Sequence, residues 1–296
     1  MMLISCSQVK TLTPEEVEAH RAEVETWHAE REANLKAPNG WLNLVGLYWL
    51  EPGPNTFGRA TTNALVFPDK ITEQAGYFLV KENVVTLVVN KGVEATVNNQ
   101  LISSHVIFHP DSARPTQVQM GDLRFNIIKR DTKLGVRVRD AHADALHAFT
   151  GVARYPVNTA YRIEAVLERG DSARTVAITN VLGQTTAQRS PGTVQFTWNG
   201  KSYRLDALEE GEELSIIFAD STSGNETYGA GRFLYAKKPS ADNKVILDFN
   251  KAYNPPCAFT AFATCPLPPR QNVLPIAIRA GEKNYGEGSI HALPVQ

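Results

Sequence analysis

The 296-residue chain is poor in cysteine, methionine and tryptophan, with three, three and four residues respectively. No apolar run reaches the roughly 20 residues that a membrane-spanning helix needs, and the longest, 42–50, is interrupted by Asn43 and Gly46. Neither sign of charge dominates, because 30 Lys and Arg residues face 31 Asp and Glu residues. This balance gives no electrostatic reason to expect nucleic acid or an anionic membrane surface as a partner.

Standard catalytic and cofactor motifs are also missing. The sequence contains no G-x-S-x-G elbow, no P-loop, no H-E-x-x-H and no complete dinucleotide fingerprint. S-x-x-K occurs only at residues 7–10, inside a polar N-terminal stretch. No cofactor is therefore expected, and the motifs leave open whether the protein is an enzyme.

Two histidine-containing stretches raise the question of a metal site. Residues 140–147, DAHADALH, hold two acids and two histidines, and His105 and His109 lie four residues apart. A zinc site needs three or four ligands on a firm scaffold. Because 140–147 has the character of an exposed linker between domains, we expect no metal site.

What the chain does contain is an ordinary apolar fraction of 43%, enough for a soluble protein with a proper core. A helix is predicted from Thr13 to about Lys36, since Thr13 can cap it and Pro14 suits its first position. Pro38-Asn39-Gly40 then ends it. The dense apolar stretch 41–50 is expected to close a core.

From residue 53 onward, short β-branched runs alternate with turn residues, which predicts strands. Asn199-Gly200 is the strongest hairpin signal. The predicted fold is mainly β, with an N-terminal helix followed by two antiparallel, β-sandwich or barrel-like units. Its divisions are a tether at 1–12, the helix at 13–37, a first unit at 38–148 and a second at 149–296.

The order of elements in the first unit resembles that of forkhead-associated domains. Those domains bind phosphopeptides through Arg and Ser residues in their loops. Arg59 fits this pattern, but the usual G-R-S-x-x-x-D and S-x-x-H pairings are not clearly present. The resemblance therefore implies an architecture, and phosphopeptide binding is not expected.

Leu3-Ile4-Ser5-Cys6 resembles the lipobox at which bacteria cleave a signal peptide and acylate the new N-terminal cysteine. A basic n-region and an apolar h-region do not precede it. We expect a lipid anchor at Cys6 and a location in the cell envelope or periplasm, with a frayed cytoplasmic terminus as the alternative. Contact with a membrane is expected only through this anchor.

With Cys6 set aside, Cys257 and Cys265 form a pair separated by a short, proline-stiffened loop. In an oxidising compartment such a pair favours a disulfide. Two alternatives stay open: two buried free thiols, or one reactive or metal-binding cysteine.

The run 245–274 organises the rest of the chain, because five prolines make it a stiff, irregular segment that carries many polar groups. Its pattern is DFN-x-AYNPPCAFT-x3-TCPLPP-x2-N-x-L, followed by I-x-AGEK at 278–283. Together with 40–58 and 218–235, it resembles the signature of a widespread bacterial and fungal family known only as a domain of unknown function. The resemblance implies no activity.

The polar, glycine-rich loop 220–232 and the loop at 248–272 should flank one predicted hairpin, formed by 233–235 and 245–249. We therefore expect their polar side chains to meet at one end of it. The leading hypothesis is a binding site for a small polar ligand. The alternatives are a hydrolase or transferase that uses carboxylates or Cys257 in the same cleft, and a structural lipoprotein that docks envelope proteins. The candidate residues are Asp220, Thr222, Ser223, Glu226, Tyr228, Arg232, Asp248, Asn250, Tyr253, Asn254 and Cys257.

Overall fold

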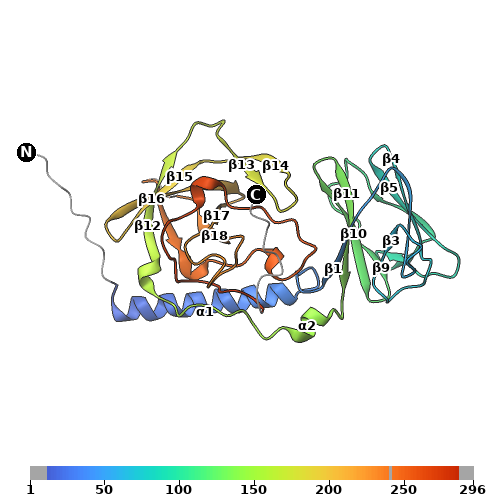
Figure 1. Cartoon of the computed structure of the whole chain (residues 1–296), viewed down its shortest axis with the longest axis horizontal. Helices are drawn as coiled ribbons and strands as arrows, with labels where there is room; N and C mark the ends of the chain where they lie inside the picture. The colour runs from blue at the N-terminus through green and yellow to red at the C-terminus, as the bar shows by residue number, and fades with distance from the viewer. Residues whose placement is uncertain (1–11, 240–241, 287–296) are drawn as a thin grey trace, which may run out of the picture. The chain divides into compact units, whose positions relative to one another are not determined.

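Strands are the main regular secondary structure of the computed structural model, which describes residues 12–239 and 242–286 (Figure 1). The predicted fold class, mainly β with an N-terminal helix, is confirmed. The chain forms two compact units. Unit 1 comprises 1–33, 152–258 and 264–296, and unit 2 comprises 34–151 and 259–263. The predicted division kept the helix separate, whereas the structure groups residues up to Ala33 with the strands that follow residue 151.

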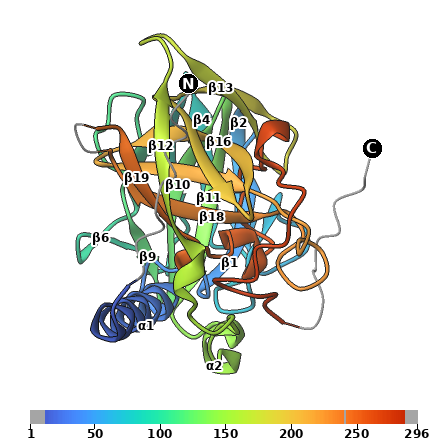
Figure 2. The ribbon, with the colours of Figure 1, turned by 90° about the vertical axis from the view of Figure 1, so that its left-hand side faces the viewer.

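The helix α1 (Pro14–Lys36) begins where the sequence predicts. The Thr13 hydroxyl accepts a hydrogen bond from the Glu16 amide at 3.2 Å, and the Glu16 carboxylate accepts one from the Thr13 amide at 2.8 Å. This reciprocal capping box satisfies amides that a helix start leaves unpaired. Within unit 1, α1 lies at the foot of β12 (Arg162–Arg169) (Figure 2). Among the described residues, no helix is long and apolar enough to cross a membrane.

Unit 2 is the predicted β-sandwich. Its core joins two sheets through fully buried rings such as Phe57, Phe78 and Phe125. A short helix, α2 (Asp144–Ala148), follows the last strand. One sheet has the order β1 (Leu44–Trp49), β11 (Lys133–Asp140), β10 (Leu123–Arg130), β9 (Val118–Met120), β6 (Thr96–Val97) and β7 (Gln100–Leu101), and the other β3 (Leu65–Val66), β2 (Gly53–Gly58), β4 (Gly76–Lys81), β5 (Val84–Val89) and β8 (Ser104–Phe108).

Unit 1 is built on one strongly curved antiparallel sheet. Its first and last strands lie next to each other, so the sheet nearly closes into a barrel. The sheet order is β18 (Arg232–Lys237), β17 (Glu213–Phe218), β16 (Lys201–Glu210), β15 (Gly192–Trp198), β12 and β19 (Lys244–Asp248), and a separate pair is β13 (Thr175–Thr179) with β14 (Thr185–Arg189). The irregular segments contain the 3-10 turns η1 (Thr159–Tyr161), η2 (Phe249–Lys251), η3 (Pro256–Ala258) and η4 (Arg270–Asn272).

The predicted Asn199-Gly200 hairpin is present between β15 and β16, with Trp198 opposite Lys201. Both turn residues have positive φ, as a two-residue hairpin of this kind requires. The prediction that 233–235 and 245–249 pair as a hairpin is wrong, because these two strands form no hydrogen-bonded ladder with each other. β19 pairs with β12 and β18 with β17, because closure of the curved sheet provides other partners for both strands.

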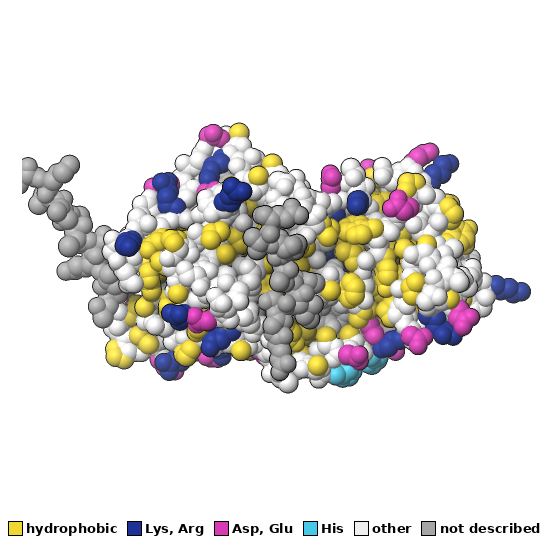
Figure 3. Space-filling view, viewed as in Figure 1, with side chains coloured by type: hydrophobic (Ala, Val, Ile, Leu, Met, Phe, Trp, Pro, Cys, Tyr) yellow, Lys and Arg dark blue, Asp and Glu magenta, His cyan; other side chains and the backbone are white. Residues whose placement is uncertain are grey.

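The surface carries both signs of charge. On the face drawn in Figure 3, Lys and Arg side chains alternate with Asp and Glu side chains. This mixture agrees with the net charge of −1.

Candidate functional site

Asp220 organises the loop between β17 and β18. One of its carboxylate oxygens accepts hydrogen bonds from the Thr222 amide and hydroxyl, and the Ser223 hydroxyl lies 3.4 Å from it. The other accepts from the Arg232 guanidinium at 3.0 Å and from the Ile278 amide at 2.8 Å. Asp220 therefore binds its own loop and the segment that follows residue 276.

Arg232 is 1% exposed, at the start of β18. Besides Asp220, its guanidinium donates to the carbonyls of Ile278, Ala280 and Glu282. Burial lowers the pKa of this guanidinium, and the adjacent Asp220 opposes that effect. These contacts give the loop a charged but internally paired anchor.

Asp248 and Asn250 form a second network, separate from that of Arg232. An Asp248 oxygen lies 2.7 Å from Nε2 of His20 on α1, and the other accepts from the backbone and side-chain amides of Asn250. The Asn250 side chain also accepts from the Asn158 amide at 2.9 Å and donates to the Asn158 carbonyl at 3.0 Å. This two-point contact fixes the backbone that leads into η1.

Tyr253 and Asn254 contact α1 and the end of the signature. The Arg31 guanidinium lies 4.7 Å from the centroid of the Tyr253 ring and donates to the Asn254 carbonyl. The Asn254 amide donates to a Glu282 oxygen at 2.7 Å, and Arg31 Nε lies 3.4 Å from the other. Burial raises the pKa of Glu282, which is 1% exposed. Sequence reasoning proposed no role for Arg31 or Glu282.

The predicted disulfide is absent, and this is a correction. Cys257 and Cys265 are buried free thiols, and the Cys257 amide donates to Sγ of Cys265 at 3.0 Å. The hydrogen bond between the two side chains lowers the pKa of the Cys257 thiol. Burial raises the pKa of the Tyr228 hydroxyl, and the two thiols add to that effect. Chain spacing could not distinguish such a hydrogen-bonded pair from a covalent one.

A groove of about 430 Å³ lies in unit 1, between α1 and the segment that leads into β12. Its volume falls within the range of about 300–1,000 Å³ typical of small-molecule sites. Eight residues line the groove; two of them are arginines and none is acidic. The eight residues are Val17, Arg21, Pro156, Val157, Asn158, Thr159, Tyr161 and Arg279.

Three of the predicted loop residues bind residues that line this groove or precede a lining residue in the chain. Asn250 fixes Asn158, as described above, and Asp248 holds His20, which precedes Arg21. Glu226 binds the Arg279 guanidinium through both of its oxygens, at 2.8–3.1 Å, and accepts from the Tyr155 hydroxyl. The Arg279 hydrogen bonds, followed by that from Tyr155, lower the pKa of Glu226 to about 2.

The groove-lining residues are absent from the predicted set. Arg279 is the variable position of the I-x-AGEK pattern, and 156–161 carries no motif. Only folding brings α1, 156–161 and Arg279 together. The one local signal was Asn158, which caps η1 by accepting from the Ala160 amide.

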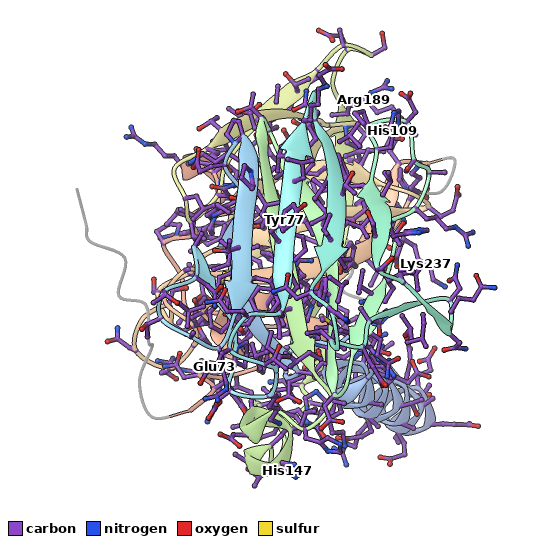
Figure 4. The ribbon with its side chains drawn as sticks, turned by 90° about the vertical axis from the view of Figure 1, so that its right-hand side faces the viewer. Glu73, Tyr77, His109, His147, Arg189 and Lys237 are labelled. Atoms are coloured by element: carbon purple, nitrogen blue, oxygen red, sulfur yellow. The ribbon has the colours of Figure 1, made fainter. Side chains whose placement is uncertain are left out.

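Within the described residues, no group of three or more His, Cys, Asp or Glu side chains could hold a metal ion. Figure 4 shows His109 and His147 at opposite ends of the view. Cys6, the predicted lipidation site, lies outside the described residues.

Two solved structures are similar to parts of the chain. An uncharacterized protein of Haloarcula marismortui, determined by solution NMR, is 29% identical, with a TM-score of 0.40, and the match covers 47% of this chain and 80% of that one. The FhaA FHA domain, crystallised with the intracellular domain of Rv3910, is 17% identical, with a TM-score of 0.22 and coverage of 31% and 97%.

No curated protein matches the chain. A family model does, over residues 147–283, which include both predicted loops and Arg279. Its description is "Protein of unknown function (DUF1684)", so the predicted resemblance to an uncharacterised family is confirmed, and this part of the chain matches DUF1684.

Proposed function

We propose that the protein binds a small anionic molecule in the groove between α1 and 156–161. The observation that carries this proposal is the lining itself. Guanidinium groups from Arg21 and Arg279, which are far apart in the sequence, line one groove with an amide and two hydroxyl-bearing side chains, and no carboxylate lies among the lining residues. Such a set of donors favours a ligand rich in acceptors.

Some residues of the predicted site contact the residues that form this groove, and others do not. Asp220 and Arg232 bind each other and backbone groups, so we assign them to the stability of the loops. Glu226, Asp248 and Asn250 instead hold residues in or next to the groove. Positioning of this kind is what a binding site requires from the residues behind it.

The geometry favours binding over the predicted enzyme alternative at Cys257. Its thiol is 7% exposed and does not line the groove. A nucleophile must reach its substrate at hydrogen-bond or van der Waals distance. We therefore assign no covalent step to this cysteine.

A thermal-shift titration at fixed ionic strength tests the proposal, with acetate, benzoate, succinate and inorganic phosphate as anions and glucose as a neutral control. A ligand at a hundredfold excess over its Kd stabilises by about 2.7 kcal/mol, which raises Tm by roughly 2–4 °C per kcal/mol in a domain of this size. We expect at least one anion to raise the wild-type Tm and to lose that effect in Arg21→Gln and Arg279→Gln.

Arg204→Gln is the matched control. Arg204 is also exposed in unit 1 and pairs with a glutamate, Glu168, but it does not line the groove. Equal anion effects in all three variants would contradict the proposal, and so would the absence of any effect in the wild-type protein.

A further inference from the structure

The two arginines of the groove differ in how strongly a carboxylate of the protein already binds them. Glu226 holds Arg279 in a two-oxygen contact at 2.8–3.1 Å. Arg21 pairs with Glu18, one turn away at 3.5 Å, and the two side chains are 54% and 70% exposed. It also lies near Glu25, whose carboxylate is already bound by Arg154. An exposed pair such as Arg21 with Glu18 contributes little, so a ligand can recruit Arg21. The groove thus offers one readily available positive charge.

The two guanidiniums also differ in which N–H donors are available to a ligand. Arg279 donates from Nε and Nη2 to Glu226, so Nη1 is its main donor to the groove. The ion pair of Arg21 with Glu18 is made through Nη1. A planar guanidinium with its fork available binds a planar carboxylate through two parallel hydrogen bonds. Arg21 is therefore the residue suited to a carboxylate, and Arg279 can add a single contact.

Four of the other six lining residues offer apolar surface, and Asn158 and Thr159 are polar. The four are Val17, Pro156, Val157 and Tyr161, whose ring stacks on Trp198 with centroids 4.9 Å apart and planes at 22°. A compact inorganic anion would leave these surfaces in contact with water. A ring-sized apolar body would cover them and remove their apolar area from water, which favours binding.

We infer that the groove takes a monocarboxylate with an apolar ring-sized body, such as an aromatic or alicyclic acid. Arg21 binds the carboxylate, Arg279 supplies a second contact, and the ring packs on Val17, Pro156, Val157 and Tyr161. This inference rests on the proposed function and narrows it to one class of ligand.

Isothermal titration of the full chain with matched compounds tests the inference. Benzoate and cyclohexanecarboxylate carry both features, acetate has the charge without the ring, and benzyl alcohol has the ring without the charge. Succinate and inorganic phosphate carry more charge and no ring. We expect both ring acids to bind at least tenfold more tightly than any of the other four.

Variants locate the contacts. Arg21→Gln should weaken benzoate binding at least tenfold, and Arg21→Lys should restore only part of it, because lysine keeps the charge without the fork. Val17→Ser should weaken benzoate and leave acetate unchanged. Arg204→Gln should bind like the wild type.

The outcomes separate the two proposals. If phosphate, succinate or acetate binds as tightly as benzoate and depends on Arg21 and Arg279, the ring-acid inference is overturned and the anion groove stands. If no compound depends on either arginine, both fail. A full rescue by Arg21→Lys would also overturn the assignment of a two-point carboxylate contact.

Discussion

Asp220 and Arg232 form a buried ion pair in unit 1, and their side chains are 0% and 1% exposed. Each is surrounded by hydrogen-bond partners from its own loop or from 278–282. Such an arrangement is stable when intact and costly when broken, because the remaining charge stays buried without its counter-ion. The pair thus fixes the loop between β17 and β18 to the segment that carries Arg279.

Arg232→Ala and Asp220→Ala should each lower the free energy of unfolding by about 3–5 kcal/mol. The control is Arg204→Gln, which removes an exposed pair and should cost no more than about 1 kcal/mol. Urea unfolding followed by tryptophan fluorescence measures both. Losses below 1 kcal/mol for the buried pair would show that this network does not hold the loop.

Glu282 gives the fold a pH dependence of definite sign. Burial raises its pKa above the ordinary value of 4.5, so the folded state holds this proton more tightly than the unfolded state does. The resulting stabilisation is full below pH 4.5 and is lost as pH rises through the raised pKa. Glu282→Gln mimics the protonated form and lacks this loss. Between pH 4 and pH 8, the stability difference between the two proteins should therefore shift in favour of Glu282→Gln.

Unfolding free energies of both proteins at several pH values test this expectation. A parallel pH dependence would show that Glu282 titrates alike in the folded and unfolded states. The measurement also reports on Arg31, whose guanidinium opposes the rise in the pKa of Glu282.

At the residue scale, the sequence predicted which loops carry buried polar groups but not their partners. Arg232 was expected in a cluster with Asp248 and instead binds Asp220, twelve residues away. Asp248 binds His20, 228 residues away. Loop composition shows that polar groups must be satisfied, whereas the identity of a partner depends on the tertiary fold.

At the scale of elements, most strand positions and the helix start follow from local patterns. The sequence predicts strands at 76–81, 84–89, 175–179 and 192–198, and β4, β5, β13 and β15 have these bounds, because alternation and turn residues are local signals. The stretch that forms β1 predicts core but no strand, because its residues are apolar on both faces. The stretch that forms β2 predicts no strand, because it contains Gly and Pro. The pairing of β19 with β12 depends on sheet closure, which no local pattern encodes.

Two glycines show how an element's ends depend on backbone geometry. Gly200 in the β15–β16 turn has φ of +74°, and a Cβ there would meet nothing within 4 Å. Gly231, just before β18, has φ of +87°, and a Cβ there would lie 2.5 Å from the Phe218 carbonyl oxygen. Both need the left-handed region, but only Gly231 is also crowded.

Gly200→Ala should therefore cost about 1–2 kcal/mol for backbone strain alone. Gly231→Ala should cost the same strain plus roughly 1–3 kcal/mol for the steric conflict. Chemical unfolding of the two variants in parallel gives the comparison. Equal losses would mean that the backbone around Phe218 and Gly231 relaxes freely.

At the scale of the whole molecule, cellular location stays a proposal drawn from Leu3 to Cys6. We propose a lipid anchor at Cys6. Labelled palmitate should enter the protein when its natural gene is expressed in a bacterium, and Cys6→Ser should abolish the label. Equal labelling of both forms, or none, would contradict the anchor. The proposal of groove binding is argued from described residues and does not depend on this result.

Unit 1 is discontinuous in sequence, and most of α1 belongs to it. His20 and Val24 on α1 are 5% and 1% exposed. His20 contacts Asp248 of unit 1 at 2.7 Å, and Arg31 contacts Glu282 at 3.4 Å. Removing the helix would expose the apolar surface that it covers and take from Asp248 and Glu282 the partners that α1 supplies. Each loss of this kind is large against the 5–15 kcal/mol that stabilises a typical domain.

We therefore expect the chain that begins at Asn34 to lose hydrogen-exchange protection in β12 and β15–β19, whereas β10 and β11 of unit 2 keep theirs. Addition of a peptide spanning residues 12–33 should restore protection in unit 1, and the same peptide with His20→Ala and Arg31→Ala should restore less. Unit 2 serves as the internal control, since its core residues come from 34–151. Retained protection in β12 and β19 without the helix would show that unit 1 folds without α1, and the groove would then be a site completed by a separately docking helix.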